Sequence, residues 1–155
     1  MAMSPYLRAL REHVGPMRLL LPSVSAHLFD ADGRLLLVRQ RELDVWSTPG
    51  GMIEPDERPA DAVVREVWEE TGQQVTGLAA VGVSSAHWLG RSPRGRLEDF
   101  HAVRVLFEAW CPRPGDPVVH DAGGTTLAAA WVRAGELPAL PMTDGWRGML
   151  AELVR

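Results

Sequence analysis

The segment GMIEPDERPADAVVREVWEETGQ, residues 51–73, carries the clearest structural signals in the chain. Pro59 is acceptable in a first helical turn and Gly72 is a typical C-terminal stop, so we expect a helix over residues 59–71. At about 100° per residue, one edge of this helix is apolar and should be buried. That edge comprises Ala60, Val63, Val64, Val67 and Thr71.

A second edge of the same helix carries three carboxylates, those of Glu66, Glu69 and Glu70. Residues 51–73 have a net charge of −5, whereas the other 132 residues sum to +1. Like charges one turn apart destabilise a helix by a few tenths of a kcal/mol. A cation resting on the cluster would explain it, and oxygen ligands suit Mg²⁺ shared with a phosphate. From the helix alone, a solvated acidic face is the alternative.

The residues around the helix complete a longer pattern. Gly51 is followed after five residues by Glu57, after seven more by Arg65-Glu66-Val67, then by Glu69-Glu70 and Gly72. This pattern resembles the Nudix box, the signature of the Nudix hydrolases, with all seven fixed polar and glycine positions present. The resemblance implies an α/β fold of the Nudix type, an α/β/α sandwich with a mixed sheet and the catalytic helix in a loop–helix–loop motif.

Three positions depart from the family pattern. Gln73 stands where a large aliphatic residue is usual, and we expect weaker packing at the helix exit. Asp56 and Arg58 stand where a glycine and a small capping residue are common, which affects the loop before the helix. None of the three removes a carboxylate.

The resemblance also implies an activity and a cofactor. Nudix enzymes hydrolyse a diphosphate linked to another moiety by attack of water on phosphorus, and a divalent metal neutralises charge and orients the nucleophile. By resemblance, Mg²⁺ or Mn²⁺, in a number left open, would bind Glu66, Glu69, Glu70 and the carbonyl of Gly50. A glycine there lets bare backbone approach the helix closely.

Further roles follow from the same resemblance. Glu66 is the first candidate for activating water, and Arg65 can hold carboxylates in place by forked hydrogen bonds. Glu57 either reaches Arg65 or a second metal through water, or has a purely structural role. Some family members take their base from a loop acid, for which Asp121 and Glu98 are the alternatives here.

Substrate recognition is less defined. Arg39 and Arg41 are candidate phosphate contacts, because arginine matches phosphate with two hydrogen bonds. Trp46 and Trp88 can stack on a base or can belong to the core. The positions that carry a Pro or Tyr marker in some subtypes fall at residues 88–91, which hold neither, so the subtype stays open.

The first residues predict a short helix. Ser4 can cap it, Pro5 can begin it and Gly15 can end it. We divide the chain into an N-terminal helical extension, residues 1–16, and a single Nudix domain, residues 17–155. One edge of this helix is apolar and comprises Tyr6, Leu7, Leu10 and Val14. We expect this edge to be buried on its own domain, in a homodimer or over the substrate cleft.

The rest of the chain alternates strand and turn signals. We expect strands over 23–29, 34–39, 75–85, 100–110 and about 129–132, a polar loop over 90–95 and a last helix capped by Thr143.

Composition excludes several classes of protein. Cys111 is the single cysteine, which rules out an internal disulfide framework and a multi-cysteine zinc site. No run of about 20 apolar residues and no secretory signal is evident, so we expect a cytoplasmic protein that does not enter the membrane. The net charge of −4 gives no basic face for duplex nucleic acid.

Two functions from different classes fit these observations. The first is a Mg²⁺-dependent diphosphatase that acts on a nucleotide or nucleoside diphosphate derivative. The second is a non-catalytic Nudix-fold sensor that binds such a molecule. Diphosphate isomerisation would need a catalytic cysteine, and Cys111, before Pro112 at the expected end of a strand, is poorly placed for it.

Overall fold

The computed structural model describes residues 4–91, 95–121 and 123–153. Among these residues, no helix has both the length and the apolar character needed to cross a membrane. The elements follow in chain order as α1 (Pro5–Val14), β1 (Leu19–Phe29), β2 (Leu35–Gln40), β3 (Trp46–Ser47), β4 (Gly50–Met52), α2 (Pro59–Thr71), β5 (Thr76–Arg91), β6 (Leu97–Trp110), β7 (Thr126–Val132), the 3₁₀ helix η1 (Ala134–Ala139) and α3 (Asp144–Leu153).

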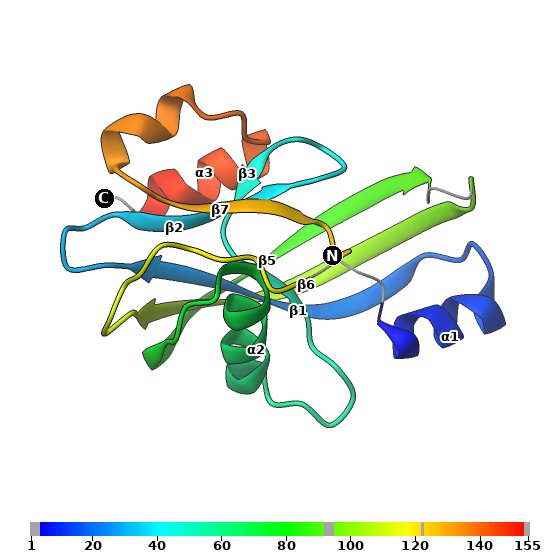
Figure 1. Ribbon diagram of the computed structural model, residues 1–155. Helices are drawn as coiled ribbons and strands as arrows, with labels where there is room; N and C mark the ends of the chain where they lie inside the picture. The colour runs from blue at the N-terminus through cyan, green and yellow to red at the C-terminus, as the bar shows by residue number, and fades with distance from the viewer. Residues whose placement is uncertain (1–3, 92–94, 122, 154–155) are drawn as a thin grey trace.

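A mixed sheet with the order β3-β2-β1-β6-β5 forms the middle layer. Strands β1 and β6 run parallel over their whole shared length, from Leu19 opposite Phe100 to Phe29 opposite Trp110. Strands β5 and β6 form a long antiparallel pair. Helices α2 and α3 lie on opposite sides of this sheet (Figure 1). The α/β/α architecture expected from the sequence is therefore confirmed.

The sheet divides into two branches beside β1. Strand β2 pairs with β1 only where Phe29 faces Leu35, and then pairs with β3 and β7. Strand β4 takes its place next to β1, with Gly50 opposite Ser25. The split between β4 and the β2–β7 branch is where the acidic residues of α2 lie, as described below.

The main hydrophobic core lies between α2 and the sheet. Its largest cluster includes Val24, Ala26, Leu28, Leu36, Ala62, Val63, Val67 and Phe107. The helix is rotated relative to the expected apolar edge: Val64 is 43% exposed, and Ala62 is fully buried instead. The reason is that Glu66 and Glu70, on the same side as Ala62, also face the protein interior.

The helix ends agree with the sequence. The hydroxyl of Ser4 accepts a hydrogen bond from the N–H of Leu7 at 3.1 Å, and that of Thr143 accepts one from Trp146 at 3.4 Å. Gly72 ends α2 with a φ of 66°, in the left-handed region that glycine adopts without strain.

Four strands, β1, β5, β6 and β7, are longer than expected, and β5 differs most. Strand β5 continues to Arg91, opposite Leu97, so Gly90 and Arg91 of the expected polar loop are strand residues. Residues 92–94 of that loop lie outside the described part of the chain. The side chains of β5 are mostly exposed, which removed the alternation that would have indicated its full length.

Helix α1 packs on its own chain. Leu7, Leu10 and Val14 contact a cluster that includes Leu21 and Phe100. Most of the apolar edge of the helix is therefore buried on its own domain, one of the three placements expected from the sequence, and the homodimer stays a prediction. Tyr6, also on that edge, stays 48% exposed.

A buried ion pair, which the sequence did not reveal, fixes α1 to β6. The guanidinium of Arg11 lies 3.1 Å from the carboxylate of Glu98, and both side chains are nearly inaccessible to solvent. Arg11 also donates to the carbonyls of Gly15 and Met17, at 2.9 and 2.6 Å, and stacks over the ring of Phe100.

We predict that Arg11→Met destabilises the fold by about 3 to 5 kcal/mol, because it leaves the Glu98 carboxylate buried without a partner. The double variant Arg11→Met/Glu98→Gln should recover much of that loss. Urea unfolding would measure both. Arg18→Met, which breaks the more exposed pair between Arg18 and Asp99, is the control and should cost about 1 kcal/mol or less. An Arg11→Met cost no larger than this control would contradict the anchoring role of the ion pair.

Candidate functional site

Arg65 connects the acidic residues around α2. Its guanidinium donates two hydrogen bonds to Glu57, at 2.8 and 2.9 Å, and one to Glu66 at 2.8 Å. It also donates to Glu69 at 3.4 Å and to the carbonyl of Met52 at 3.0 Å. The hydrogen bonds from Arg65 lower the pKa of Glu57, and the same pairing raises the pKa of Arg65. Of the two roles considered for Glu57, the structure thus contains the contact with Arg65.

Glu70 lies at the split in the sheet and contacts both branches. One carboxylate oxygen accepts from the N–H of Gly50 on β4 at 2.9 Å, and the other accepts from the hydroxyl of Thr126 on β7 at 2.8 Å. Burial raises the pKa of Glu70 to about 7, and the nearby Glu66 carboxylate adds to this effect. Thr126 was not predicted, because only the pairing of β2 with β7 brings it to α2.

The glycine pair at β4 allows the helix to approach. A Cβ atom on Gly51 would collide with the carboxylate of Glu66, and one on Gly50 would collide with the carbonyl of Val24. Gly50 also has a φ of 155°, which side chains rarely adopt. Gly50 therefore requires glycine, whereas a side chain at Gly51 would displace the Glu66 carboxylate; with glycine at both positions, the backbone of β4 can lie directly against the acids of α2.

The loop before α2 accommodates its two departures from the family pattern. Asp56 has a φ of 64°, a left-handed conformation that aspartate tolerates better than most residues. Arg58 occupies the N-cap position without capping the helix, and its guanidinium instead pairs with Asp61 at 2.7 Å. The loop therefore keeps the geometry of the motif, without the stabilisation of a small cap.

The chemistry of these residues fits a divalent cation. The donors are all oxygens, as a hard cation such as Mg²⁺ requires. Glu66 is 9% exposed, and its pKa, like that of Glu70, is raised by burial, so a cation would offset the cost of the two buried charges. Among the described residues, no three acidic, histidine or cysteine side chains converge on one point as they stand. Arg65 holds Glu66 and Glu69 in this arrangement by hydrogen bonds of 2.8 and 3.4 Å.

The two loop acids considered as alternative bases lie in different places. The N–H groups of His120 and Asp121 both donate to the carbonyl of Glu69, at 2.8 and 2.9 Å, so Asp121 lies beside the last turn of α2. Glu98 is instead engaged by Arg11 under α1. The structure therefore brings Asp121 to the acidic cluster and gives Glu98 a structural role.

The four predicted substrate contacts are distributed around the sheet. Arg39 pairs with Asp44 at 2.6 Å, and Arg41 donates to the carbonyl of Gly124 at 3.3 Å. Both tryptophans contribute to packing: Trp46 contacts the hydrophobic cluster under α3, and Trp88 stacks on the ring of Phe100, with 5.8 Å between ring centroids. The structure thus assigns each tryptophan the packing role that was the alternative to base stacking.

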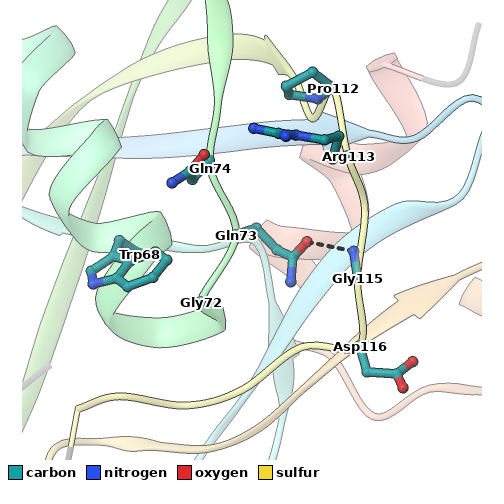
Figure 2. Close-up of a pocket in the computed structure, with 8 residues that line it drawn as sticks. All are labelled: Trp68, Gly72, Gln73, Gln74, Pro112, Arg113, Gly115 and Asp116. Carbon is teal, nitrogen blue, oxygen red and sulfur yellow. Dashed lines mark hydrogen bonds between the residues drawn. The ribbon is translucent and has the colours of Figure 1, made fainter.

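Gln73 stabilises the exit of α2 rather than weakening it. Its side chain is 6% exposed, accepts from the N–H of Gly115 at 3.0 Å and donates to the carbonyl of Thr71 at 3.3 Å. Figure 2 shows the hydrogen bond between Gln73 and Gly115, two residues that line a pocket of about 300 Å³ together with Trp68. Glu66, Glu69 and Glu70 do not line this pocket, so it is distinct from the acidic cluster.

Comparisons with known proteins agree with this geometry. A MutT-like protein of Streptomyces ambofaciens is 49% identical over 61 residues, which are 39% of this chain and 40% of that protein. An RNA pyrophosphohydrolase of Gluconobacter oxydans is 44% identical over 61 residues, 38% of this chain and 36% of that protein. The chain thus spans about two fifths or less of the length of these two relatives.

A solved structure shares the fold over nearly the whole chain. The NUDIX domain of Shewanella oneidensis NrtR, solved with ADP ribose, superposes with a TM-score of 0.69 over 97% of each chain at 19% identity. A family model described as the NUDIX domain matches residues 19–153. With the Arg65-centred cluster, the glycine pair and the split sheet in place, the chain belongs to the Nudix family.

Proposed function

We propose that this chain is a Mg²⁺-dependent diphosphatase that hydrolyses a nucleotide or a nucleoside diphosphate derivative. The observation that carries the proposal is the complete set of box carboxylates around Arg65, with Glu66 and Glu70 buried at the split in the sheet. A protein that only binds its ligand has no need to keep every acidic ligand, so we favour the enzyme over the sensor.

The proposed reaction follows from these positions. Nudix hydrolases generally use a divalent metal, which here would be held by Glu66, Glu69, Glu70 and the carbonyl of Gly50 and would neutralise phosphate oxygens. Arg65 orients Glu66 and Glu69. Glu66, or Asp121 beside the last turn of α2, would take a proton from water as the water oxygen attacks phosphorus, and the bridging P–O bond would break with the bridging oxygen leaving on the other phosphate. Burial strengthens Glu66 as a base, because it raises the pKa of this group.

A substrate panel tests the proposal directly. Nucleoside tri- and diphosphates, nucleotide sugars, ADP-ribose and dinucleoside polyphosphates would be incubated with Mg²⁺ or Mn²⁺, and released phosphate or pyrophosphate measured. Turnover of at least one class is the expected result. Binding of a panel member without turnover under any metal condition would favour the sensor.

We predict that Glu69→Gln and Glu70→Gln each lower turnover by at least about a hundredfold at saturating Mg²⁺, because each removes a charged metal ligand. The fold should persist, since neither residue belongs to the apolar cluster of Val63 and Val67. Asp61→Asn is the matched control: it lies on the same helix, is exposed and should stay within about twofold of the parent. Near-normal rates in both glutamine variants would refute the metal assignment.

We also predict a pH dependence for metal-free stability. The folded protein holds a proton on Glu70 up to about pH 7, whereas the unfolded chain releases it near 4.5. Between these values the folded state binds more protons, so the free energy of unfolding falls as pH rises, by at most about 3 kcal/mol.

Urea unfolding at a series of pH values, with a chelator present, would measure this decline. Glu70→Gln should remove most of it, and Asp61→Asn should retain it. Mg²⁺ should reduce the decline in the parent, because it stabilises the charged carboxylate. An equal decline in the parent and Glu70→Gln would mean that Glu70 is not the titrating group.

A further inference from the structure

Arg104 on β6 is a half-buried cation without an acidic partner. Its guanidinium lies over the ring of Trp146 on α3, 4.5 Å from the ring centroid. Among the described residues, no carboxylate or carbonyl accepts a hydrogen bond from it, in contrast to Arg11 and Arg65. Burial lowers the pKa of Arg104, and no neighbouring acid opposes this. A half-buried guanidinium whose N–H groups have no acceptor among the described residues can donate them to a ligand.

Two polar side chains near Arg104, those of Ser84 and His27, also lack hydrogen-bond partners among the described residues. Ser84 lies directly opposite Arg104 on β5, and its hydroxyl is buried with no hydrogen bond to the described residues. The imidazole of His27 on β1 is fully buried, and neither of its nitrogens has a hydrogen-bond partner among the residues that the structure describes. The pKa of His27 is lowered to about 4 by burial and by the positive charge of Arg104.

The register of the sheet relates Arg104 to the acidic cluster. On β6, Val105 and Phe107 contact the core under α2, so Arg104 points to the opposite face, where Trp146 covers it. Gly50 pairs with Ser25 on β1, and Arg104 pairs with Ser23 two residues away on the other side of β1. Two strand spacings and two residues place the Cα atoms of Gly50 and Arg104 about 12 Å apart. A ribose and base attached to a diphosphate at Gly50 can bridge that separation, whereas the diphosphate itself cannot.

We propose that Arg104, held over the ring of Trp146, determines base specificity by donating two hydrogen bonds to O6 and N7 of guanine. This inference rests on the proposed function and names its substrate class. The contact with the indole ring uses none of the N–H groups of Arg104 as hydrogen-bond donors, and guanine is the base that offers two adjacent acceptors on one edge to a guanidinium fork. Adenine places its N6 amino group, a donor, where guanine has O6, so it opposes the same contact.

Steady-state kinetics with GTP, ATP, CTP and 7-deaza-GTP would test this inference. The parent should prefer GTP over ATP and CTP by about tenfold or more in kcat/KM. Arg104→Met, which preserves the packing on Trp146, should remove that preference by lowering kcat/KM for GTP while leaving ATP within about threefold. Arg104→Lys should also lose it, because it keeps the charge but not the fork. Arg18→Met, at an exposed arginine, should leave all four values unchanged.

The nucleotide 7-deaza-GTP, which lacks the N7 acceptor, tests the same contact without any change to the protein. Its kcat/KM should be several-fold below that of GTP in the parent and equal to it in Arg104→Met. The inference would be overturned if the parent used GTP and ATP equally or preferred CTP. It would also be overturned if the preference for GTP were unchanged in Arg104→Met or fully retained in Arg104→Lys.

A binding measurement separates this inference from the proposed activity. Calorimetric titration of Glu66→Gln with GMP and AMP should show tighter binding of GMP, and the added substitution Arg104→Met should abolish the difference. Selective GMP binding by a chain that hydrolyses no panel member would refute the diphosphatase but support the guanine site. Turnover of a panel member, with equal binding of GMP and AMP, would support the diphosphatase and refute the guanine site.

Discussion

The geometry of the site depends on a single carboxylate that bridges two branches of one sheet. Glu70 accepts a hydrogen bond from Gly50 on β4 and another from Thr126 on β7, and these strands belong to the two branches that diverge on the edge of β1 opposite β6. A continuous sheet would satisfy its own N–H groups, and only a split offers a free donor to a helix. The position of α2, the bare backbone at Gly50 and the acidity of the cluster all follow from this bridge.

The two arginines that matter most for the site are in opposite situations. Arg65 faces three carboxylates, and its five hydrogen bonds leave it no capacity for a ligand. Arg104 faces an indole ring and no acid, so its N–H groups remain available. The first arginine organises the residues proposed to act on the diphosphate, and the second is positioned to recognise what the diphosphate is attached to.

Local spacing was sufficient to predict helix ends and the residues around Arg65, since those contacts lie within one turn or one loop. It was not sufficient for Arg11, Thr126 or Arg104, whose partners come from strands or helices far away in the sequence. The prediction that Val64 is buried was wrong, because the helical spacing was read from the apolar residues alone. That spacing does not predict a helix that buries two glutamates, Glu66 and Glu70, and exposes Val64.

Local rules of stability are broken at several of the residues described above. Asp56 has a positive φ, Arg58 leaves the helix uncapped, Glu66 and Glu70 are buried like charges, and Arg104 lies unpaired beyond them. Elsewhere, Arg11 and Arg34 each have a carboxylate partner. Such departures persist in natural proteins where function requires them. Of these departures, the buried carboxylates and Arg104 belong to the contacts that we propose for the diphosphate and the base, so ligand binding would offset their cost.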